Sequence, residues 1–538
     1  MAGATQTNLI TGDTSQTNAV AAGAVALAAL LFALSLAALF EIVTISDPVA
    51  GVPIVTLLGL ILVTLGGSVI VFGVGSYLDY VETQPSPSAG LVAAAVFSGV
   101  WFTVGGLVAS QTFGLSGLAW LSVALLTGAG AFALTALPPE DIGSTLPAGA
   151  LTLLTGLVFV TGTIGPAWVW ELRFEQQASF TAEFVIPTAT LLAALLSGWA
   201  AAKAYGGFGA RGRHMGAYVL IYLNASSIVG VLFVLVAFTT TKGIPGLLTG
   251  AELGSGPDVT LFGITFGLPF SVPFVMNGVA LLNDFQGVLP AIVGTIWLVI
   301  GAVLFAVPLG VGAAIFLTEY AERGRLTQAV EVATNGLWST PSIVFGLFGF
   351  AFLIPRFGGN KSLISGMLTL SFMLLPLVLI TSREAILAVP DEYRDASAAL
   401  GVSKWQTIRS VVIPAALPGV VTGVILGVGR IAGETAPILL TMTGGTFIPG
   451  GQTVDVIGGF RFTATPPFVA NPELLQATTA LPFQLYALVR AGVGLGDNVT
   501  NPEQFQWATA LILLVVVLSF YAVGICARYY FRRRLKHE

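Results

Sequence analysis

Charged residues, cysteine and histidine are all scarce in this chain. Of its 538 residues, 9% are charged, one is cysteine and two are histidine, whereas ordinary soluble domains are about a quarter charged. The single cysteine, Cys526, excludes an internal disulfide framework, and His214 with His537 cannot form a metal cluster. Lys and Arg number only 21, so the chain lacks the basic footprint that nucleic-acid binding requires.

Long apolar runs take the place of the missing charges. Hydrophobic residues make up 55% of the chain, and a membrane-crossing helix needs about 20 mostly apolar residues. We therefore predict an all-α polytopic membrane protein with about twelve transmembrane helices. The predicted spans are residues 19–41, 52–76, 91–111, 115–137, 147–168, 185–204, 215–240, 288–317, 333–354, 363–386, 414–440 and 507–531.

The distribution of basic residues predicts the orientation. Lys and Arg in short loops mark the cytoplasmic side. Fourteen of them fall on the side that holds the C-terminus and the loops at 318–327 and 383–413, against six on the other side. We expect that first side to be cytoplasmic. The opening residues 1–18 have no Lys or Arg, which disfavours a cleavable signal peptide and predicts a polar, disordered tail.

A Gly-rich basic linker, from Lys203 to His214, separates the first six spans from the last six. The predicted regions are a tail at 1–18, an N-terminal membrane region of unknown role at 19–205 and a second membrane region at 206–538. Two long external segments lie at about 241–287 and 441–506. The second contains ALPFQLYALVRAG, which predicts a short amphipathic helix.

The loop at 390–414 reads PDEYRDASAALGVSKWQTIRSVVIP. Pro390 and the acids after it predict a helix start, and Gly401 stands where a helix end takes a left-handed residue. Ser403 with Gln406 predicts a capping box for a second helix. The loop is therefore expected to form two short helices joined at a glycine.

Both short helices carry apolar side chains on one face. Tyr393, Ala396 and Leu400 share a face of the first helix, and Trp405 lies on the apolar face of the second. Pro414 is expected to end the unit where the chain enters the membrane. These faces would contact either a partner protein or lipid headgroups, and the spacing alone leaves both alternatives open.

Residues 429–437, GRIAGETAP, place two charges inside the apolar run 414–440. Each charge at the bilayer centre costs about 2.5–3.5 kcal/mol on insertion scales. Arg430 and Glu434 are four residues apart and can pair along a helix. The pair is either a buried ion pair that fixes helix register or part of a substrate pathway. Pro437 is expected to bend the helix beside Glu434.

A stripe of small residues accompanies these charges. Gly419, Gly423, Gly427, Arg430 and Glu434 lie within an arc of about 80° on a helix, and Gly429 with Gly433 forms a neighbouring stripe. Small residues spaced in this way let membrane helices pack closely. One face of the helix is therefore expected to look into protein or a water-filled cavity rather than lipid.

Several segments resemble a known family. Asp395-Ala396-Ser397, then Gly401, then Val411-Val412-Ile413-Pro414 resembles the EAA loop of ABC importer permeases, with its spacing intact and mild substitutions. TPSIVFGLFG at 340–349 and GRIAGETAP resemble the PstA-type permease of the phosphate importer. The motifs cover about 206–538, so the chain resembles an extended form of that permease.

The resemblance implies a permease subunit of an ATP-driven phosphate importer. Its implied partners are a second, PstC-type permease, a PstB-type ATPase dimer and an extracellular PstS-type phosphate-binding protein. This chain would bind no cofactor, because the partner ATPase would use ATP and magnesium. In agreement, GGNKS at 358–362 has Asn360 where a phosphate-binding loop needs Gly. The alternatives are a permease for molybdate, tungstate or sulfate, and a membrane scaffold or sensor with a permease-like core.

The resemblance also suggests roles for individual residues. The expected substrate-pathway residues are Arg430, Glu434, Thr435, Ser339 and Ser342, although the two serines can equally bond back to their own helix. The expected ATPase-coupling residues are Tyr393, Asp395, Ala396, Ser397, Leu400, Gly401 and Trp405. The expected helix-packing residues are Gly419, Gly423, Gly427, Gly429, Gly433 and Pro437.

Overall fold

The computed structural model describes most of the chain in two compact units, Met1–Val236 and Ala237–Glu538. The described residues are 16–49, 51–173, 177–254, 258–261, 264–267, 269–278, 287–322, 324–443, 453–466, 468–491 and 502–537. The boundary falls inside α7 (Gly209–Leu247), later than the 205/206 boundary that the linker predicts. The predicted tail lies outside the described residues up to residue 15, and residues 16–18 already belong to a helix.

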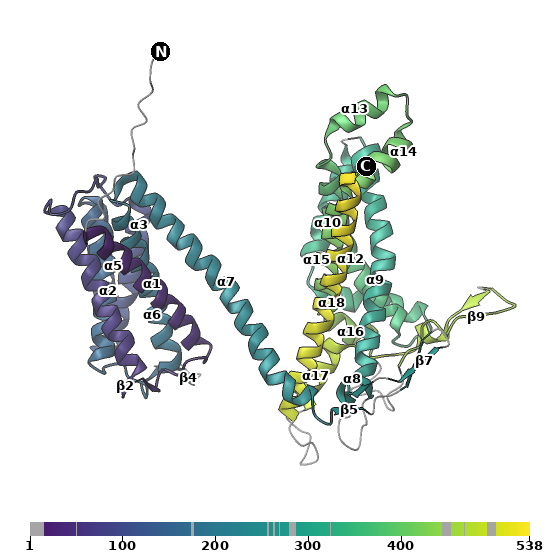
Figure 1. Ribbon diagram of the computed structural model, residues 1–538, viewed down its shortest axis with the longest axis horizontal. Coiled ribbons are helices and arrows are strands. Elements are labelled where there is room, and N and C mark those ends of the chain that lie inside the picture. The colour runs from purple at the N-terminus through teal and green to yellow at the C-terminus, as the bar shows by residue number, and fades with distance from the viewer. Residues whose placement is uncertain are drawn as a thin grey trace. The chain divides into compact units, whose positions relative to one another are not determined.

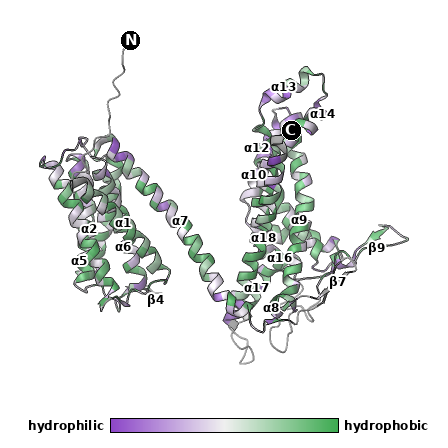
Figure 2. Cartoon of the chain, in the orientation of Figure 1, coloured by the Kyte–Doolittle hydropathy of each residue, from purple (hydrophilic) through white to green (hydrophobic). Residues whose placement is uncertain are grey.

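The described helices confirm the prediction of about twelve spans. Eleven of them are long and apolar enough to cross a membrane, and one bent pair makes a twelfth. Their apolar surfaces run the length of each bundle, as the green colouring in Figure 2 shows.

The first unit is a bundle of apolar helices, followed by the first part of α7 (Figure 1). The other helices are α1 (Gln16–Leu39), α2 (Ile54–Tyr77), α3 (Leu91–Leu107) with the π turn η1 (Val108–Thr112), α4 (Leu118–Ala136), α5 (Glu140–Val160) and α6 (Ala182–Tyr205). Two short hairpins pair β1 (Pro48–Val49) with β2 (Val52–Pro53) and β3 (Val169–Arg173) with β4 (Gln177–Thr181).

Glycines let α2 and α5 approach closely in this unit. A Cβ added to Gly59 would lie 2.9 Å from the carbonyl oxygen of Gly156, and one added to Gly66 would lie 2.7 Å from that of Gly149. Neither position has room for a side chain, which is how small residues bring membrane helices together. The fully buried Leu62 belongs to the core of this unit.

The second unit contains the rest of α7 and all later elements. Its helices are α8 (Pro273–Met276), α9 (Leu289–Ile315) with the π turn η2 (Phe316–Tyr320), α10 (Arg325–Ser339), α11 (Ser342–Phe348) with η3 (Gly349–Leu353) and η4 (Ile354–Arg356), α12 (Leu363–Leu387), α13 (Asp391–Ala399), α14 (Lys404–Thr407) with the π turn η5 (Ile408–Val412), α15 (Ile413–Ala432), α16 (Ala436–Thr441), η7 (Pro472–Leu475), α17 (Leu481–Ala491) and α18 (Pro502–His537).

Helix α12 is the centre of this unit. The apolar window of α12 is 72% buried, against 11% for α18. Helix α9 packs tightly against it, because a Cβ on Gly310 would lie 2.8 Å from the Val378 side chain. The amphipathic helix predicted near the end of the chain is confirmed as α17.

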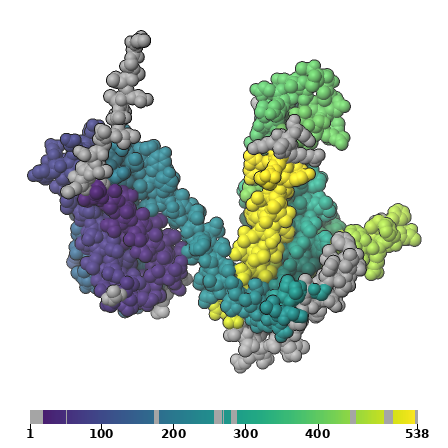
Figure 3. Space-filling view, in the orientation of Figure 1, coloured from purple at the N-terminus to yellow at the C-terminus, as the bar shows by residue number. Residues whose placement is uncertain are grey.

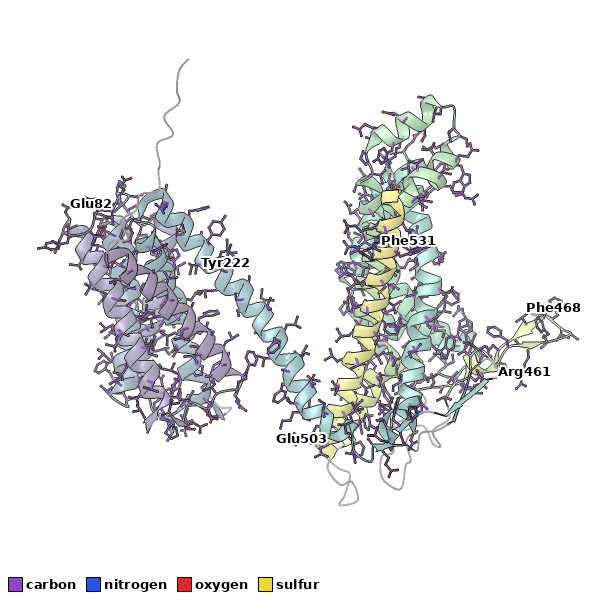
Figure 4. The ribbon with its side chains drawn as sticks, in the orientation of Figure 1. Glu82, Tyr222, Arg461, Phe468, Glu503 and Phe531 are labelled. Atoms are coloured by element: carbon purple, nitrogen blue, oxygen red, sulfur yellow. The ribbon has the colours of Figure 1, made fainter. Side chains whose placement is uncertain are left out.

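Short antiparallel strand pairs, two of them hairpins, occupy the two segments that the sequence predicts as long external loops. The strand pairs are β5 (Glu252–Leu253) with β8 (Phe270–Ser271), β6 (Asp258–Leu261) with β7 (Ile264–Gly267), and β9 (Arg461–Phe462) with β10 (Val469–Ala470). Figure 4 shows Arg461 and Phe468 on the last of these hairpins, which projects from its unit.

Two predicted spans are wrong as single helices. The span at 333–354 is two segments, Arg325–Ser339 and Ser342–Arg356, which meet at an angle of 104°. The span at 414–440 stops at Ala432, and a separate helix begins at Ala436. Both breaks lie beside predicted pathway residues.

Candidate functional site

The loop at residues 390–414, which we call the coupling loop after the role expected for it, forms the two expected helices. Pro390 precedes α13, and Gly401 follows its end with a φ of +72°, a conformation that favours glycine. The backbone N–H of Ser403 donates to Gln406 Oε1 at 3.1 Å at the start of α14. The glycine and the capping residues that predict the turn between the two helices therefore form it in the structure.

The loop stands beyond the end of its bundle (Figure 3), and it exposes large apolar side chains. The exposed fractions of Tyr393, Leu400 and Trp405 are 52%, 82% and 54%. Asp395 and Ala396 are exposed as well. Ser397 is buried, and its hydroxyl donates to the Tyr393 carbonyl at 3.0 Å. An exposed apolar surface of this kind marks a site of contact with a protein partner or with lipid headgroups.

The expectation that Pro414 ends the loop is wrong, because the helix continues through it. Residues Lys404–Ala432 form one helical span. Pro414 cannot donate to the carbonyl four residues earlier, and its ring would clash there. The π turn Ile408–Val412 widens the helix at that point, and the Ile413 N–H donates to the Ile408 carbonyl.

The glycine face of α15 lies against α12. A Cβ on Gly419 would lie 2.7 Å from the Ala385 Cβ, and one on Gly423 would overlap the Thr381 side chain. Gly427 meets Leu374 in the same way. The Gly429 position instead abuts the Tyr521 hydroxyl on α18, and the space beside Gly433 is open within 4 Å.

The predicted pairing of Arg430 with Glu434 along one helix is wrong. Helix α15 ends at Ala432, so Glu434 lies in the break, and its N–H donates to the Ile431 carbonyl at 3.2 Å. The Arg430 guanidinium carbon lies 4.4 Å from the centroid of the Trp338 ring. Among the described residues, no acid lies within the 4.0 Å of Arg430 that defines an ion pair.

The break has a local cause on each side of Glu434. Gly433 caps α15, and Thr435 precedes α16. Pro437 is the second residue of α16 and cannot donate to the Gly433 carbonyl. The predicted bend is therefore a full interruption, and it leaves Arg430 in the last turn of α15.

The second break consists of Thr340 and Pro341, between α10 and α11. Trp338 lies in the last turn of α10, just before this break. Thr340 is extended, with ψ 131°, because a residue that precedes proline is driven out of the helical region. Pro341 then precedes α11. The Ser339 hydroxyl donates to the Gly336 carbonyl of its own helix at 3.0 Å. This bond is the expected alternative to a pathway role for Ser339. Ser342 is half-buried at the first position of α11.

The structure therefore brings the two interruptions together through one contact. The guanidinium of Arg430, from the end of α15, lies over the ring of Trp338, from the end of α10. A guanidinium group can bind an oxyanion through two parallel N–H donors. Broken helices inside membrane proteins occur where they are buried in protein or line a water-filled cavity.

Sequence reasoning missed Lys361 beside the break. Its ammonium donates to the Leu439 carbonyl at 2.8 Å, and the next N–H, from Ser362, donates to the Thr441 carbonyl at 3.0 Å. These bonds hold the C-terminal end of α16 against the start of α12. Burial lowers the pKa of Lys361 from its ordinary value.

A buried ion network in the first unit was also missed. Lys203 Nζ lies 2.7 Å from Glu140 Oε1, with 1% and 0% of the two side chains exposed. Glu140 Oε2 accepts the backbone N–H groups of Ser86 and Gly209, each at 3.0 Å. The sequence predicts that the linker begins at Lys203 and the fifth span at residue 147, whereas Lys203 lies in the last turn of α6 and Glu140 begins α5. Two prolines and two acids before an apolar run mark such a helix start.

Comparison with known proteins places the second unit in a family. The family described as "Binding-protein-dependent transport system inner membrane component" matches residues 306–537. "Phosphate transport system permease protein PstA 1" of Mycobacterium tuberculosis is 33% identical over 253 residues, which cover 46% of this chain and 72% of that protein. The chain belongs to the PstA-type permeases of this family.

Other PstA-type relatives match over different lengths. "Phosphate transport system permease protein PstA" of Haemophilus influenzae is 30% identical over 272 residues, which cover 50% of this chain and 85% of that protein. "Probable ABC transporter permease protein YqgI" of Bacillus subtilis is 41% identical over 138 residues, or 26% of this chain, and the match spans about half, 47%, of its length. The PstA-type permease described here is thus a permease component of an ABC importer.

A solved structure of the MetNI methionine ABC transporter shares 18% identity with this PstA-type permease. It covers 46% of this chain and 94% of its own, with a TM-score of 0.33. The family match begins inside α9, so the helices of the first unit precede the part that it covers.

Proposed function

We propose that this chain is the permease subunit of an ATP-driven importer of inorganic phosphate. The observation that carries the proposal is its similarity to PstA phosphate permeases over 72% and 85% of their lengths. The proposed pathway passes the two broken helices, where the Arg430 guanidinium lies over the Trp338 ring.

The position of Arg430 supports a role in anion binding rather than in helix register. No acid among the described residues neutralises it at ion-pair distance. An arginine that is half-buried and lacks an acidic partner attracts an anion. Glu434 and Thr435 are proposed to line the break after α15 and Ser342 the break before α11, and Glu434 would keep the site from retaining its dianion.

The proposed assembly supplies the energy and the substrate. A PstB-type ATPase dimer would bind ATP and magnesium and receive the exposed face of the coupling loop on the cytoplasmic side. A PstC-type permease would complete the pathway, and an extracellular PstS-type protein would deliver phosphate. This chain would itself be non-catalytic and bind no cofactor.

Uptake of radiolabelled phosphate by cells that express the full assembly tests the pathway. Arg430→Gln removes a charged hydrogen-bond donor set worth about 1.5–3 kcal/mol, so we expect uptake to fall roughly 10- to 100-fold. Arg430→Lys should retain part of it. Arg461→Gln is the matched control, because Arg461 is exposed on a projecting hairpin.

Two results would contradict the proposal. Normal phosphate uptake by an assembled Arg430→Gln complex would show that Arg430 does not contribute to the pathway. Competition experiments with unlabelled sulfate, molybdate, tungstate and phosphate identify the substrate. If one of the other anions inhibits uptake of radiolabelled phosphate more strongly than unlabelled phosphate does, the chain belongs to a permease for that anion.

A further inference from the structure

Few side chains of α13 attach the coupling loop to the bundle. Arg394 is the one residue of α13 whose side chain hydrogen-bonds outside this helix, within the part of the chain that the structure describes. Tyr393 and Leu400 are exposed. The side-chain hydrogen bonds that join α13 to the bundle therefore all come from Arg394 within the described residues.

Arg394 uses its guanidinium group to join three elements. Its Nη2 and Nε donate to Glu319 Oε1 at 2.9 and 3.2 Å, and Glu319 lies on the π turn at the end of α9. Its Nη2 and Nη1 also donate to the carbonyls of Ile386 and Val389 at 3.1 and 2.8 Å, at the end of α12. A second bond from Nη1 reaches Asp391 Oδ1 at 3.1 Å.

This pair is more protected than an ordinary surface ion pair. Only 22% of Arg394 and 9% of Glu319 is exposed. A guanidinium presents its donors in a fixed fork, so several simultaneous bonds define one orientation of the loop. Lys404 adds a second attachment to the same turn, since its ammonium lies 5.1 Å from the centroid of the Tyr320 ring.

The elements that Arg394 joins continue to the broken helices. Helix α9 packs on α12 through Gly310, and α12 packs on α15 through Gly419 and Gly423. Helix α15 ends beside Arg430. Packed helices of this kind transmit displacement, because close-packed interiors are not freely compressible.

We propose that Arg394 and Glu319 are the positioning pair through which movement of the coupling loop reaches α9 and α12. This inference rests on the proposed function, because it assigns the pair a role in coupling ATP hydrolysis to import. Without the pair, the ATPase still binds α13 and α14, but movement imposed on α13 no longer reaches α9 and the end of α12, and only the route through the continuous helix Lys404–Ala432 remains.

The test uses the complete complex in proteoliposomes, with its ATPase, second permease and phosphate-loaded binding protein. The measured quantity is the coupling ratio, defined as phosphate imported per ATP hydrolysed. Glu319→Gln keeps the size of the side chain and removes its charge. We expect this variant and Arg394→Gln to lower the coupling ratio at least fivefold, while the ATPase remains bound. Arg394→Lys should restore part of the ratio.

A double variant and a control variant show whether the effect comes from the Arg394–Glu319 interaction. The double variant Arg394→Gln/Glu319→Gln should be no worse than Arg394→Gln alone, because that single variant already lacks the bonds to Glu319. The control is Arg383→Gln, which breaks the 2.8 Å pair with Glu331 between α12 and α10. We expect the control to keep its coupling ratio within twofold of the unmodified complex.

The outcomes are distinguishable. An unmodified complex that imports no phosphate would defeat the proposed function itself. An unmodified complex that imports phosphate, beside a Glu319→Gln complex with the same coupling ratio, would overturn only the role of the pair. Loss of ATPase binding in Glu319→Gln would overturn it too, since the pair would then merely fold the loop.

Discussion

Replacing Lys203 by alanine should destabilise the buried contacts around Glu140 in the first unit. Lys203 is 1% exposed and neutralises Glu140, which is 0% exposed. The alanine variant leaves that carboxylate buried without its main counter-charge. Removing one partner of a buried ion pair destabilises proteins by about 3–5 kcal/mol.

The backbone contacts of Glu140 provide a direct measurement. The N–H groups of Ser86 and Gly209 both donate to Glu140 Oε2 at 3.0 Å. Hydrogen–deuterium exchange of these two amides in the full-length protein follows local opening of the network. A loss of about 3–5 kcal/mol corresponds to exchange that is on the order of 100- to 5,000-fold faster.

Arg213→Ala is the matched control for this measurement. Arg213 also faces Glu140, at 3.6 Å, but it is 53% exposed. Exposed ion pairs contribute about 0–1 kcal/mol, so exchange should accelerate less than about tenfold. Equal exchange rates in the two alanine variants would refute the reasoning that burial makes the Lys203 contact dominant.

Three further predictions concern the second unit. Gly423→Val should place a branched side chain against Thr381 and destabilise the purified chain by about 1–3 kcal/mol, whereas Gly433→Ala, which has open space, should leave its thermal unfolding unchanged. Gly401→Ala forces a Cβ into a φ of +72°, at a cost of about 1–2 kcal/mol, and should weaken co-purification of the ATPase; undiminished binding would contradict this. Burial lowers the pKa of Lys361 below 10.5 in the folded protein. Just below pH 10.5 this lysine therefore binds more protons in the unfolded state than in the folded state. The free energy of unfolding should rise as the pH increases towards that value. Lys361→Gln should flatten this rise in melting temperature between about pH 8 and about pH 10, and an unchanged slope would argue against it.

The sequence predicts the membrane spans well because each depends on a long apolar run. Residues 363–386 are expected as a span and form α12 as Leu363–Leu387. The turn at Gly401 is equally local, since a helix end with positive φ depends on one residue. Properties set within about 20 neighbouring residues are therefore accessible without a structure.

The errors arise where backbone breaks or distant contacts decide the outcome. Pro341 signals the break before α11, but the apolar residues around it conceal the signal in a span count. Arg430 was expected to pair with its neighbour Glu434, whereas its partner, Trp338, comes from another helix. Lys203 and Glu140 are distant in sequence, so their ion pair has no local periodicity to indicate it.

The unbroken helix from Lys404 to Ala432 has a mechanical consequence. It contains 29 residues, and a rise of about 1.5 Å per residue makes it roughly 43 Å long. One end belongs to the coupling loop and the other holds Arg430. A rod of this length acts as a lever: a tilt of about 5° at one end carries the other through roughly 4 Å, which exceeds the length of a hydrogen bond. Small rotations at the loop are thus sufficient to separate Arg430 from Trp338.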